Sequence, residues 1–406
     1  MASRATASDG AAAEDRLARR NALVLAAAQA VGGSAATIAF ATGGLVGLTL
    51  MPEAPGLATL PITGFVVGTA CGSVPAALVM RRVGRRPGFL LGALLSLLGG
   101  LAATTAIFAA SFLGFLAATF LSGFAQAFVQ QYRFAAADTA SDAFKPKAVS
   151  WVLAGGIVAG VVGPQAVILT SDLFAPILFA GAYAAQAALA AASCLVLACL
   201  RIPRPPPRDA GVGGGRPIGT IFATARLRVA VMCGIVAYAL MNLVMTAAPM
   251  AMVACGFSTA EAALGIQWHV IAMYGPSFFT GGLIARFGAE RIAGVGLALL
   301  AGCGVVALAG IELAHFWTAL ILLGLGWNLA FVGATTIVVG AARPEERARV
   351  QATNDLLIFA AVALASFSSG KILDSAGWEM VNVALIAITA ITALVLSVVA
   401  LRGKAA

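Results

Sequence analysis

The sequence predicts an all-α membrane protein with twelve transmembrane helices, arranged as two six-helix halves related by a pseudo-twofold axis. Three observations predict this fold class. Of the 406 residues, 61% are apolar and 10% are charged, whereas soluble domains are about 45–50% apolar and about one-quarter charged. Apolar stretches of about 20 residues, the length that spans a bilayer as a helix, recur along the whole chain. A short loop motif also recurs at half the length of the chain.

The first six spans are expected at residues 22–50, 59–80, 87–109, 112–136, 149–170 and 176–200. Each is an apolar run that ends at a charged or Pro/Gly-containing break. Residues 1–21 form a cytoplasmic tail whose charged residues are not preceded by an apolar run, so they do not resemble a cleavable signal peptide. The first helix is therefore expected to act as the targeting signal, and residues 22–200 form the N-terminal bundle.

A polar segment at residues 201–228 separates these six spans from the next six. It starts Arg201-Ile-Pro-Arg-Pro-Pro-Pro-Arg and contains a glycine-rich run at 211–215, which favours a flexible cytoplasmic linker over a docking segment for a partner. The last six spans are expected at residues 229–254, 262–284, 292–311, 316–341, 352–371 and 379–401. They form the C-terminal bundle, residues 229–401, before a short cytoplasmic tail at 402–406.

Charge sidedness predicts the orientation of the chain. When alternate loops are counted with the N-terminus inside, 23 of the 25 Lys and Arg residues fall on the inner side. This excess is the positive-inside pattern, so both termini are expected in the cytoplasm. Basic residues at that surface lie beside anionic lipid head groups, and the net charge of +9 therefore does not require a nucleic-acid partner.

No cofactor, metal site or enzyme activity is expected. All six cysteines lie in apolar spans or at their edges, without metal-ligand spacing, and are interpreted as small buried side chains. The two histidines, His269 and His315, offer no nucleophile–base arrangement. Gly370-Lys371 lacks the upstream glycine and the following Ser or Thr of a phosphate-binding loop, which excludes ATP-driven transport.

An internal repeat supports the division into halves. After the second span the chain reads Arg82-Val-Gly84, and after the eighth it reads Arg286-Phe-Gly288, an offset of 204 residues. The charged turns after the fourth and tenth spans match at a similar offset. Parallel repeats of six spans are typical of secondary transporters in which two halves move about a central site.

These loops resemble the motif between spans 2 and 3 of the major facilitator superfamily, approximately Gly-x-Leu-Ala-Asp-Arg-x-Gly-Arg-Arg. The positions that match are Arg82, Gly84, Arg85 and Arg86 in the first copy and Gly281, Leu283, Arg286 and Gly288 in the second. The acidic position holds Arg81 and Ala285 instead, so the salt bridge that the family builds on this motif is not expected. The resemblance implies that spans 1, 4, 7 and 10 line the substrate cavity.

Two further stretches resemble a narrower branch of the superfamily that includes bacterial riboflavin importers. They are Gln130-Gln-Tyr-Arg-Phe-Ala-Ala-Ala-Asp138 and Gly324-Leu-Gly-Trp-Asn-Leu-Ala-Phe-Val-Gly-Ala-Thr335. This resemblance implies uptake of riboflavin across a bacterial inner membrane, and a monomer is the expected functional unit. The alternative is a proton-coupled drug or metabolite exporter. Such antiporters often carry an arginine at the position of Thr119, and only Gly160, Gly163 and Pro164 remain of their motif in span 5.

Polar and aromatic stripes on the cavity-lining spans identify candidate substrate-binding residues. Spacings of three, four and eight place several of these side chains on common helix faces. Carboxamides beside aromatic rings suit a neutral, planar ligand with polar edges. The alternative is that the amides and hydroxyls bond to neighbouring helices, at about 1 kcal/mol each. The candidates are Gln29, Thr37, Gln126, Gln130, Tyr238, Asn242, Trp327, Asn328 and Phe331.

Charged residues near the inner ends of both halves predict a cytoplasmic gate formed by ion pairs between the halves. These are Arg82, Arg133, Asp138, Arg286, Glu345, Arg349 and Asp355. Snorkelling of Arg133 toward the membrane surface and solvated loop positions for Glu345 and Arg349 are the alternatives. No carboxylate falls in the middle of a span, so His269 is the candidate for proton coupling, with a hydrogen-bonded packing role as the alternative. Facilitated uptake and proton symport both stay open.

Overall fold

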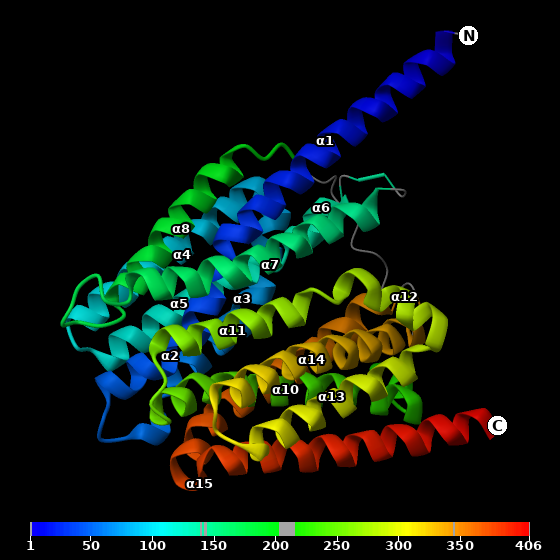
Figure 1. The fold of residues 1–406 in the computed structure, drawn as a ribbon. Helices are drawn as coiled ribbons and strands as arrows, with labels where there is room; N and C mark the ends of the chain where they lie inside the picture. The colour runs from blue at the N-terminus through cyan, green and yellow to red at the C-terminus, as the bar shows by residue number, and fades with distance from the viewer. Residues whose placement is uncertain (1, 139, 142–143, 203–215, 344–345, 406) are drawn as a thin grey trace. The chain divides into compact units, whose positions relative to one another are not determined.

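The computed structural model describes residues 2–138, 140–141, 144–202, 216–343 and 346–405, with the side chains of 2–15, 146, 347–348 and 402–405 left out. All regular structure in these ranges is helical (Figure 1). The helices before the linker are α1 (Ala2–Gly32), α2 (Ser34–Leu50), η1 (Pro55–Leu57), α3 (Leu60–Val83), α4 (Arg85–Phe108), α5 (Phe112–Val129), α6 (Tyr132–Asp138), α7 (Lys145–Thr170) and α8 (Ala180–Ala198). Those after it are α9 (Ile218–Ile221), α10 (Ala225–Ala254), α11 (Thr259–Tyr274), α12 (Ser277–Phe287), α13 (Ala289–Ala309), α14 (Leu313–Ala341) and α15 (Arg347–Ala405).

Ten of the helical stretches in the described ranges are long and apolar enough to cross a membrane. The predicted eighth span, 262–284, is instead divided between α11, with 16 residues, and α12, with 11 residues. The division falls at Gly275 and Pro276. Proline has no backbone N–H and its ring collides with the preceding helical turn, so α11 ends there and α12 starts after it.

The predicted spans 352–371 and 379–401 lie in one element, α15, whose 59 residues are interrupted at Gly377 with φ 77°. A straight helix of this length would extend about 90 Å, about three times the hydrocarbon thickness of a bilayer. The positive φ at Gly377 is readily adopted by glycine and ends the first arm of the helix. Figure 1 shows the two arms, orange and red, leaving this bend in different directions.

The first span also differs from its prediction as one helix, because α1 ends at Gly32 and α2 begins at Ser34. A Cβ atom on Gly33 would lie 2.6 Å from the carbonyl oxygen of Gln29 and 3.2 Å from Cβ of Ala159 in α7. There is no room for a side chain at this position. The break is therefore tied to a close approach of α1 and α2 to α7.

The chain divides into two compact units: Met1–Ala39 with Val67–Pro207 form unit 1, and Phe40–Val66 with Arg208–Ala406 form unit 2. Helices α2 and α3 thus each contribute one part to each unit. The segment 40–66, which we call the outer hairpin, precedes the linker in sequence but packs with the helices that follow it. The predicted bundle boundaries at 22–200 and 229–401 stay a prediction.

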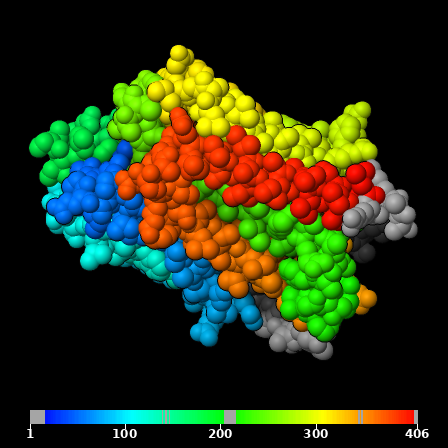
Figure 2. Space-filling model, turned by 90° about the horizontal axis from the view of Figure 1, so that it is seen from below, coloured from blue at the N-terminus to red at the C-terminus, as the bar shows by residue number. Residues whose placement is uncertain are grey.

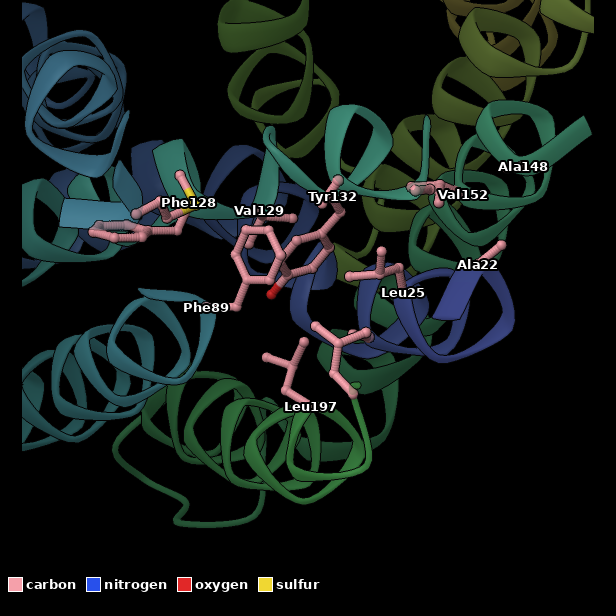
Figure 3. Close-up of a cluster of buried hydrophobic side chains, with 14 of the residues drawn as sticks. Ala22, Leu25, Phe89, Phe128, Val129, Tyr132, Ala148, Val152 and Leu197 are labelled. Atoms are coloured by element: carbon pink, nitrogen blue, oxygen red, sulfur yellow. The ribbon is translucent and has the colours of Figure 1, made fainter. Parts of the chain in front are cut away.

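The interior of unit 1 contains an apolar core to which α1, α3, α4, α5, α6, α7 and α8 contribute (Figure 3). Phe89 and Tyr132 meet edge-on in this core, with ring centroids 4.8 Å apart. Elsewhere in unit 1 glycines replace larger side chains at helix contacts. At Gly155, a Cβ would lie 2.2 Å from the carbonyl oxygen of Ala26, so α1 and α7 are in direct backbone contact.

In unit 2, a glycine likewise allows the backbones of α13 and α14 to come into contact. A Cβ on Gly296 would lie 2.2 Å from the backbone nitrogen of Ala330. The second arm of α15, drawn in red, crosses the face shown in Figure 2 and presents large apolar side chains such as Ile391, Leu394 and Leu401, which are 63%, 66% and 68% exposed. Large exposed apolar side chains along a helix of this length are suited to lipid rather than to water.

Candidate functional site

The clearest candidate for a binding surface is a group of four rings in unit 2, which we call the aromatic cluster: Tyr238, Trp327, Phe331 and Phe359. Trp327 and Phe331 are stacked, with ring centroids 5.1 Å apart and planes inclined by 10°. Tyr238 lies against both, with centroids 5.4 Å from Trp327 and 5.3 Å from Phe331. Phe359 meets Tyr238 edge-on at 6.3 Å. Helices α10, α14 and α15 therefore converge on one aromatic wall.

Local sequence explains this arrangement. Trp327 and Phe331 are four residues apart on α14 and so lie on one face of the helix. Trp327 is 8% exposed, and its indole Nε1 is buried without a hydrogen-bond partner among the residues that the structure describes. A buried N–H that lacks an acceptor costs about 1–3 kcal/mol. An acceptor atom on a bound ligand would therefore find a hydrogen-bond donor here.

The structure brings together Tyr238, Trp327 and Phe331 of the predicted substrate residues, and it adds Phe359, which sequence reasoning missed. Phe359 was missed because it lies on α15, in the predicted span 352–371, which is not among the four spans expected to line the cavity. Apolar residues from α10 and α15 and from the outer hairpin surround the cluster; they are Phe40, Val66, Ile235, Ile358, Val362 and Ala363.

The contacts of Asn328 favour helix packing over ligand binding. Its Nδ2 donates to the carbonyl oxygen of Met273 at 2.8 Å and to Oγ of Ser277 at 2.7 Å. Its Oδ1 accepts from Oγ1 of Thr280 at 2.7 Å, and the side chain is fully buried. These contacts hold α14 to the break between α11 and α12. The geometry favours the helix-packing alternative for Asn328.

Asn242 lies on α10 one turn after Tyr238 and is 3% exposed. Its Oδ1 accepts a long hydrogen bond, 3.5 Å, from Oγ1 of Thr246 on the same helix. That contact lies within α10 and joins it to no other helix. A ligand contact at Asn242 stays a prediction.

The remaining predicted substrate residues lie in unit 1. Thr37 on α2 is buried and its hydroxyl donates to the carbonyl oxygen of Ser34 at 2.9 Å, with the carbonyl oxygen of Ala159 at 3.3 Å. Gln29 on α1 is partly buried, and a Cβ on Gly155 would lie 3.1 Å from its Cβ. Gln126 on α5 and Gln130 at its C-terminal end are also partly buried. Their roles in ligand binding stay predictions.

Among the charges assigned to the gate in unit 1, Asp138 forms an ion pair with Arg85, which was not among the gate candidates, Oδ2 to Nη2 at 2.6 Å. Arg82 is exposed. Arg133 is also exposed, with its guanidinium 4.8 Å from the ring centroid of Phe134. Arg85 is the first residue of α4 and follows Gly84, whose φ is 99°. Its side chain reaches Asp138, the last residue of α6. This contact lies within unit 1.

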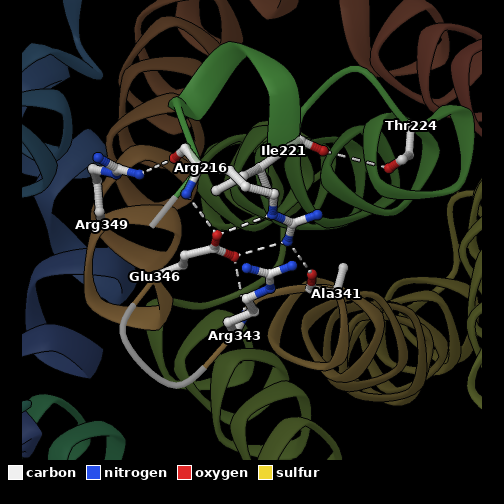
Figure 4. Close-up of polar contacts among 7 residues, drawn as sticks. All are labelled: Arg216, Ile221, Thr224, Ala341, Arg343, Glu346 and Arg349. Atoms are coloured by element: carbon white, nitrogen blue, oxygen red, sulfur yellow. Dashed lines mark hydrogen bonds and ion pairs between the residues drawn. The ribbon is translucent and has the colours of Figure 1, made fainter. Parts of the chain in front are cut away.

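A second ionic contact in unit 2 was missed altogether (Figure 4). Glu346, fully buried, accepts from the backbone nitrogen and Nε of Arg216 at 2.9 Å and from Nη2 of Arg216 at 2.8 Å. The backbone nitrogen of Arg343 donates to the same carboxylate at 3.1 Å. Hydrogen bonds from Arg216 hold the pKa of Glu346 well below its usual range. The part of the linker just before α9 is thereby fixed to the turn before α15.

The four gate candidates of unit 2 make contacts within that unit where they are described. Arg349 donates to the carbonyl oxygen of Arg216, and Asp355 accepts from Nδ2 of Asn354 at 3.4 Å. Arg286 is exposed beside the ring of Phe287. Glu345 lies outside the described residues. A gate that pairs charges of the two halves stays a prediction.

The loop motif in unit 2 carries its own ion pair. Glu290, two residues after Gly288, accepts from Nε of Arg226 at 2.7 Å. In unit 1 the residue after the motif glycine is the basic Arg85, whereas here the acid comes from the motif and the base from α10. Both copies therefore keep a charge contact although each lacks the motif's usual aspartate.

His269, the coupling candidate, is fully buried on α11, with Nδ1 2.9 Å from the carbonyl oxygen of Leu320 on α14. Its Nε2 has no hydrogen-bond partner among the described residues. The contact to Leu320 is the packing hydrogen bond that the alternative interpretation required. Proton coupling through His269 stays a prediction.

Comparison with known proteins places these features in a family. Residues 31–354 match the sequence model described as Major Facilitator Superfamily. The chain is 48% identical over 366 residues to a riboflavin transporter, RfnT, of Brucella anthropi, covering 90% of this chain and 92% of that protein. It is 27% identical over 395 residues to an uncharacterized transporter of the same superfamily, YddS of Bacillus subtilis, covering 91% and 88%. The crystal structure of the nucleoside transporter NupG superposes with a TM-score of 0.72 at 13% identity, covering 94% of this chain and 98% of that one.

Proposed function

Because the chain belongs to the Major Facilitator Superfamily, we propose that it is a riboflavin importer that works by alternating access. The observation that carries the proposal is the 48% identity to a riboflavin transporter over nine-tenths of both chains. Identity spread over that length includes the helices that would line the path of the substrate. The fold itself, shared with transporters of other substrates, does not select riboflavin.

The aromatic cluster supports this substrate on chemical grounds. Riboflavin has a flat three-ring system with carbonyl and ring-nitrogen acceptors at its edge and a neutral polyol chain. Stacking of such a ring on an aromatic side chain is worth about 1–3 kcal/mol. Trp327 offers a ring and an unpartnered indole N–H, and Tyr238 forms the other side of the wall. We assign the ring system to this cluster.

The proposal includes a topology. We count twelve crossings, with α11 and α12 as one broken span and the two arms of α15 as two. Both termini lie in the cytoplasm, the membrane is the bacterial inner membrane, and the monomer is the working unit. Reporter fusions after residue 57 and after residue 377 should then report the outside, and fusions at both termini should report the inside.

A ligand screen on purified protein tests the substrate. Riboflavin should quench intrinsic tryptophan fluorescence saturably, whereas adenosine, uridine and a cationic dye should not compete. The matched controls are Tyr238→Ala, which removes part of the cluster, and Phe108→Ala at an exposed ring elsewhere. Saturable quenching by the dye, with none by riboflavin, would instead favour the exporter.

Coupling is tested separately in vesicles. The described carboxylates include none in the middle of a span, and His269 is engaged in packing. We therefore propose facilitated uptake that is driven by consumption of riboflavin inside the cell. The riboflavin concentration inside proteoliposomes should rise to the outside concentration and no further. The rate of uptake should not respond to an imposed pH gradient. Accumulation above that concentration with an acidic exterior would contradict the facilitator.

A further inference from the structure

The loop between α7 and α8, residues 171–179, exposes large apolar side chains. Leu173 and Leu178 are 64% and 46% exposed, and Phe174 is exposed as well. The four consecutive residues 173–176 are all exposed, and Asp172 is the one charged residue of the loop. Loops that face water are normally rich in polar residues, and an exposed apolar run of this length is unfavourable there unless it binds something.

The backbone of the α7–α8 loop satisfies its own hydrogen bonds. Four of its N–H groups donate to carbonyl oxygens of residues 170–174, at 2.8–3.2 Å. They belong to Leu173, Ala175, Ile177 and Phe179. The last of these bonds runs to Ser171 and closes the loop at its base, and Pro176 has no N–H to satisfy. Internal pairing of this kind is what a segment beside acyl chains needs, because lipid tails offer no hydrogen-bond partners.

The length of α8 places the loop at the edge of the bilayer. The 19 residues of Ala180–Ala198 extend about 28 Å at about 1.5 Å per residue, and the hydrocarbon core is about 30 Å thick. Arg201 follows the far end of α8 by three residues, and basic residues at helix ends mark the level of the head groups. The loop, which directly precedes Ala180, therefore lies at the opposite edge of the hydrocarbon core.

Contacts with α4 and α8 hold the loop in this place. The ring of Phe174 meets that of Phe108, the last residue of α4, with centroids 5.3 Å apart. A Cβ on Gly181, in the first turn of α8, would collide with the carbonyl oxygen of Thr170 and lie 3.0 Å from Cβ of Leu173. The exposed side chains are therefore attached to a backbone that is packed against two membrane helices.

From these observations we propose that the α7–α8 loop is a membrane anchor. Its backbone lies at the level of the head groups, and Leu173, Phe174 and Leu178 reach the acyl chains. The partner is phospholipid and not a protein, because the loop borders the hydrocarbon core and its backbone is already paired. The proposed topology makes this the outer leaflet. The anchor does not depend on which substrate the protein carries.

Fluorescence quenching of the full chain, in nanodiscs that each hold one copy, tests the anchor. A bimane label is attached at Leu173→Cys or Leu178→Cys, in a background without the six native cysteines. Glu53→Cys, at an exposed position of the outer hairpin, is the matched control. Phospholipids with brominated acyl chains should quench the labels at 173 and 178 at least threefold more than the label at 53, and iodide should show the opposite order. Labels at 173 and 178 that iodide quenches as strongly as the label at 53, without quenching by brominated lipid, would overturn the anchor and favour a protein partner or a second copy.

A second variant shows whether the native side chains hold the loop in the bilayer. Leu173→Glu in the protein labelled at residue 178 should lower quenching by brominated lipid at least twofold, because a charged side chain is costly beside acyl chains. Leu173→Met, which stays apolar, should leave quenching unchanged, and elution as a single species verifies that each variant is folded. Equal quenching in folded Leu173→Glu and Leu173→Met would contradict the anchor. Absent riboflavin uptake with this quenching pattern intact would refute only the proposed function.

Discussion

Replacing Asn328 with alanine should destabilise the protein without acting on the substrate directly. The side chain makes three hydrogen bonds, to Met273, Ser277 and Thr280, at 2.7–2.8 Å. Interhelical hydrogen bonds in membrane proteins average about 0.6 kcal/mol each and reach about 1.7, so their loss should lower the free energy of unfolding by about 2 kcal/mol. Thr280 keeps its second acceptor, the carbonyl oxygen of Pro276 at 2.8 Å, which limits the cost.

Reversible unfolding of the purified protein in mixed detergent micelles, followed by circular dichroism, measures this loss. Ser277→Ala is the matched control, because it removes one of the three contacts and should cost about a third as much. Riboflavin affinity of the folded Asn328→Ala variant should stay within about twofold of the unmodified protein. The packing assignment would be wrong if Asn328→Ala left the free energy of unfolding unchanged and weakened riboflavin binding tenfold. That result would show that Asn328 contacts the ligand.

Further predictions concern the cluster, the helix contacts and the linker. Tyr238→Ala should weaken riboflavin binding about tenfold or more, since one stacked ring is worth about 1–3 kcal/mol, whereas Tyr238→Phe should bind nearly as well; equal affinities in fluorescence titrations would contradict stacking. Gly296→Ala should cost about 1–3 kcal/mol because its Cβ meets the backbone of Ala330 at 2.2 Å, and Gly302→Ala should not. Glu346 has a lowered pKa, so its charge stabilises the fold above the unfolded pKa of about 4.3 and that contribution is lost as the pH falls below it. The melting temperature should therefore drop more between about pH 5 and pH 3 in the unmodified protein than in Glu346→Gln, and parallel slopes would argue against the Arg216 contact.

The fold could be predicted from the sequence because hydropathy, charge sidedness and the loop repeat all act over long stretches of chain. Its interruptions were harder to predict. The break at Gly275 and Pro276 lies inside an apolar run, where proline is common in membrane helices because neighbours satisfy the freed backbone groups. The close contact at Gly33 depends on Ala159, more than a hundred residues later, and no local pattern reports it.

The candidate site was predictable to the extent that one helix face determines it. Trp327 and Phe331 are four residues apart, so their stacking follows from helix geometry. Asn328 shares the same segment, yet its partners on α11 and α12 depend on how the helices pack. The same holds for the charges: Arg216 and Glu346 are 130 residues apart, and only the folded chain shows that the linker binds that carboxylate.

Uptake of labelled riboflavin by a bacterium that can neither make nor import it tests the central claim most directly. Cells that produce the chain should take up riboflavin saturably and grow at concentrations that do not support the parent strain. Cells that produce Tyr238→Ala at equal membrane levels should show at least a tenfold lower initial rate at low riboflavin. Verified membrane insertion of the unmodified chain with uptake no faster than in the parent strain would contradict the assignment as a riboflavin importer.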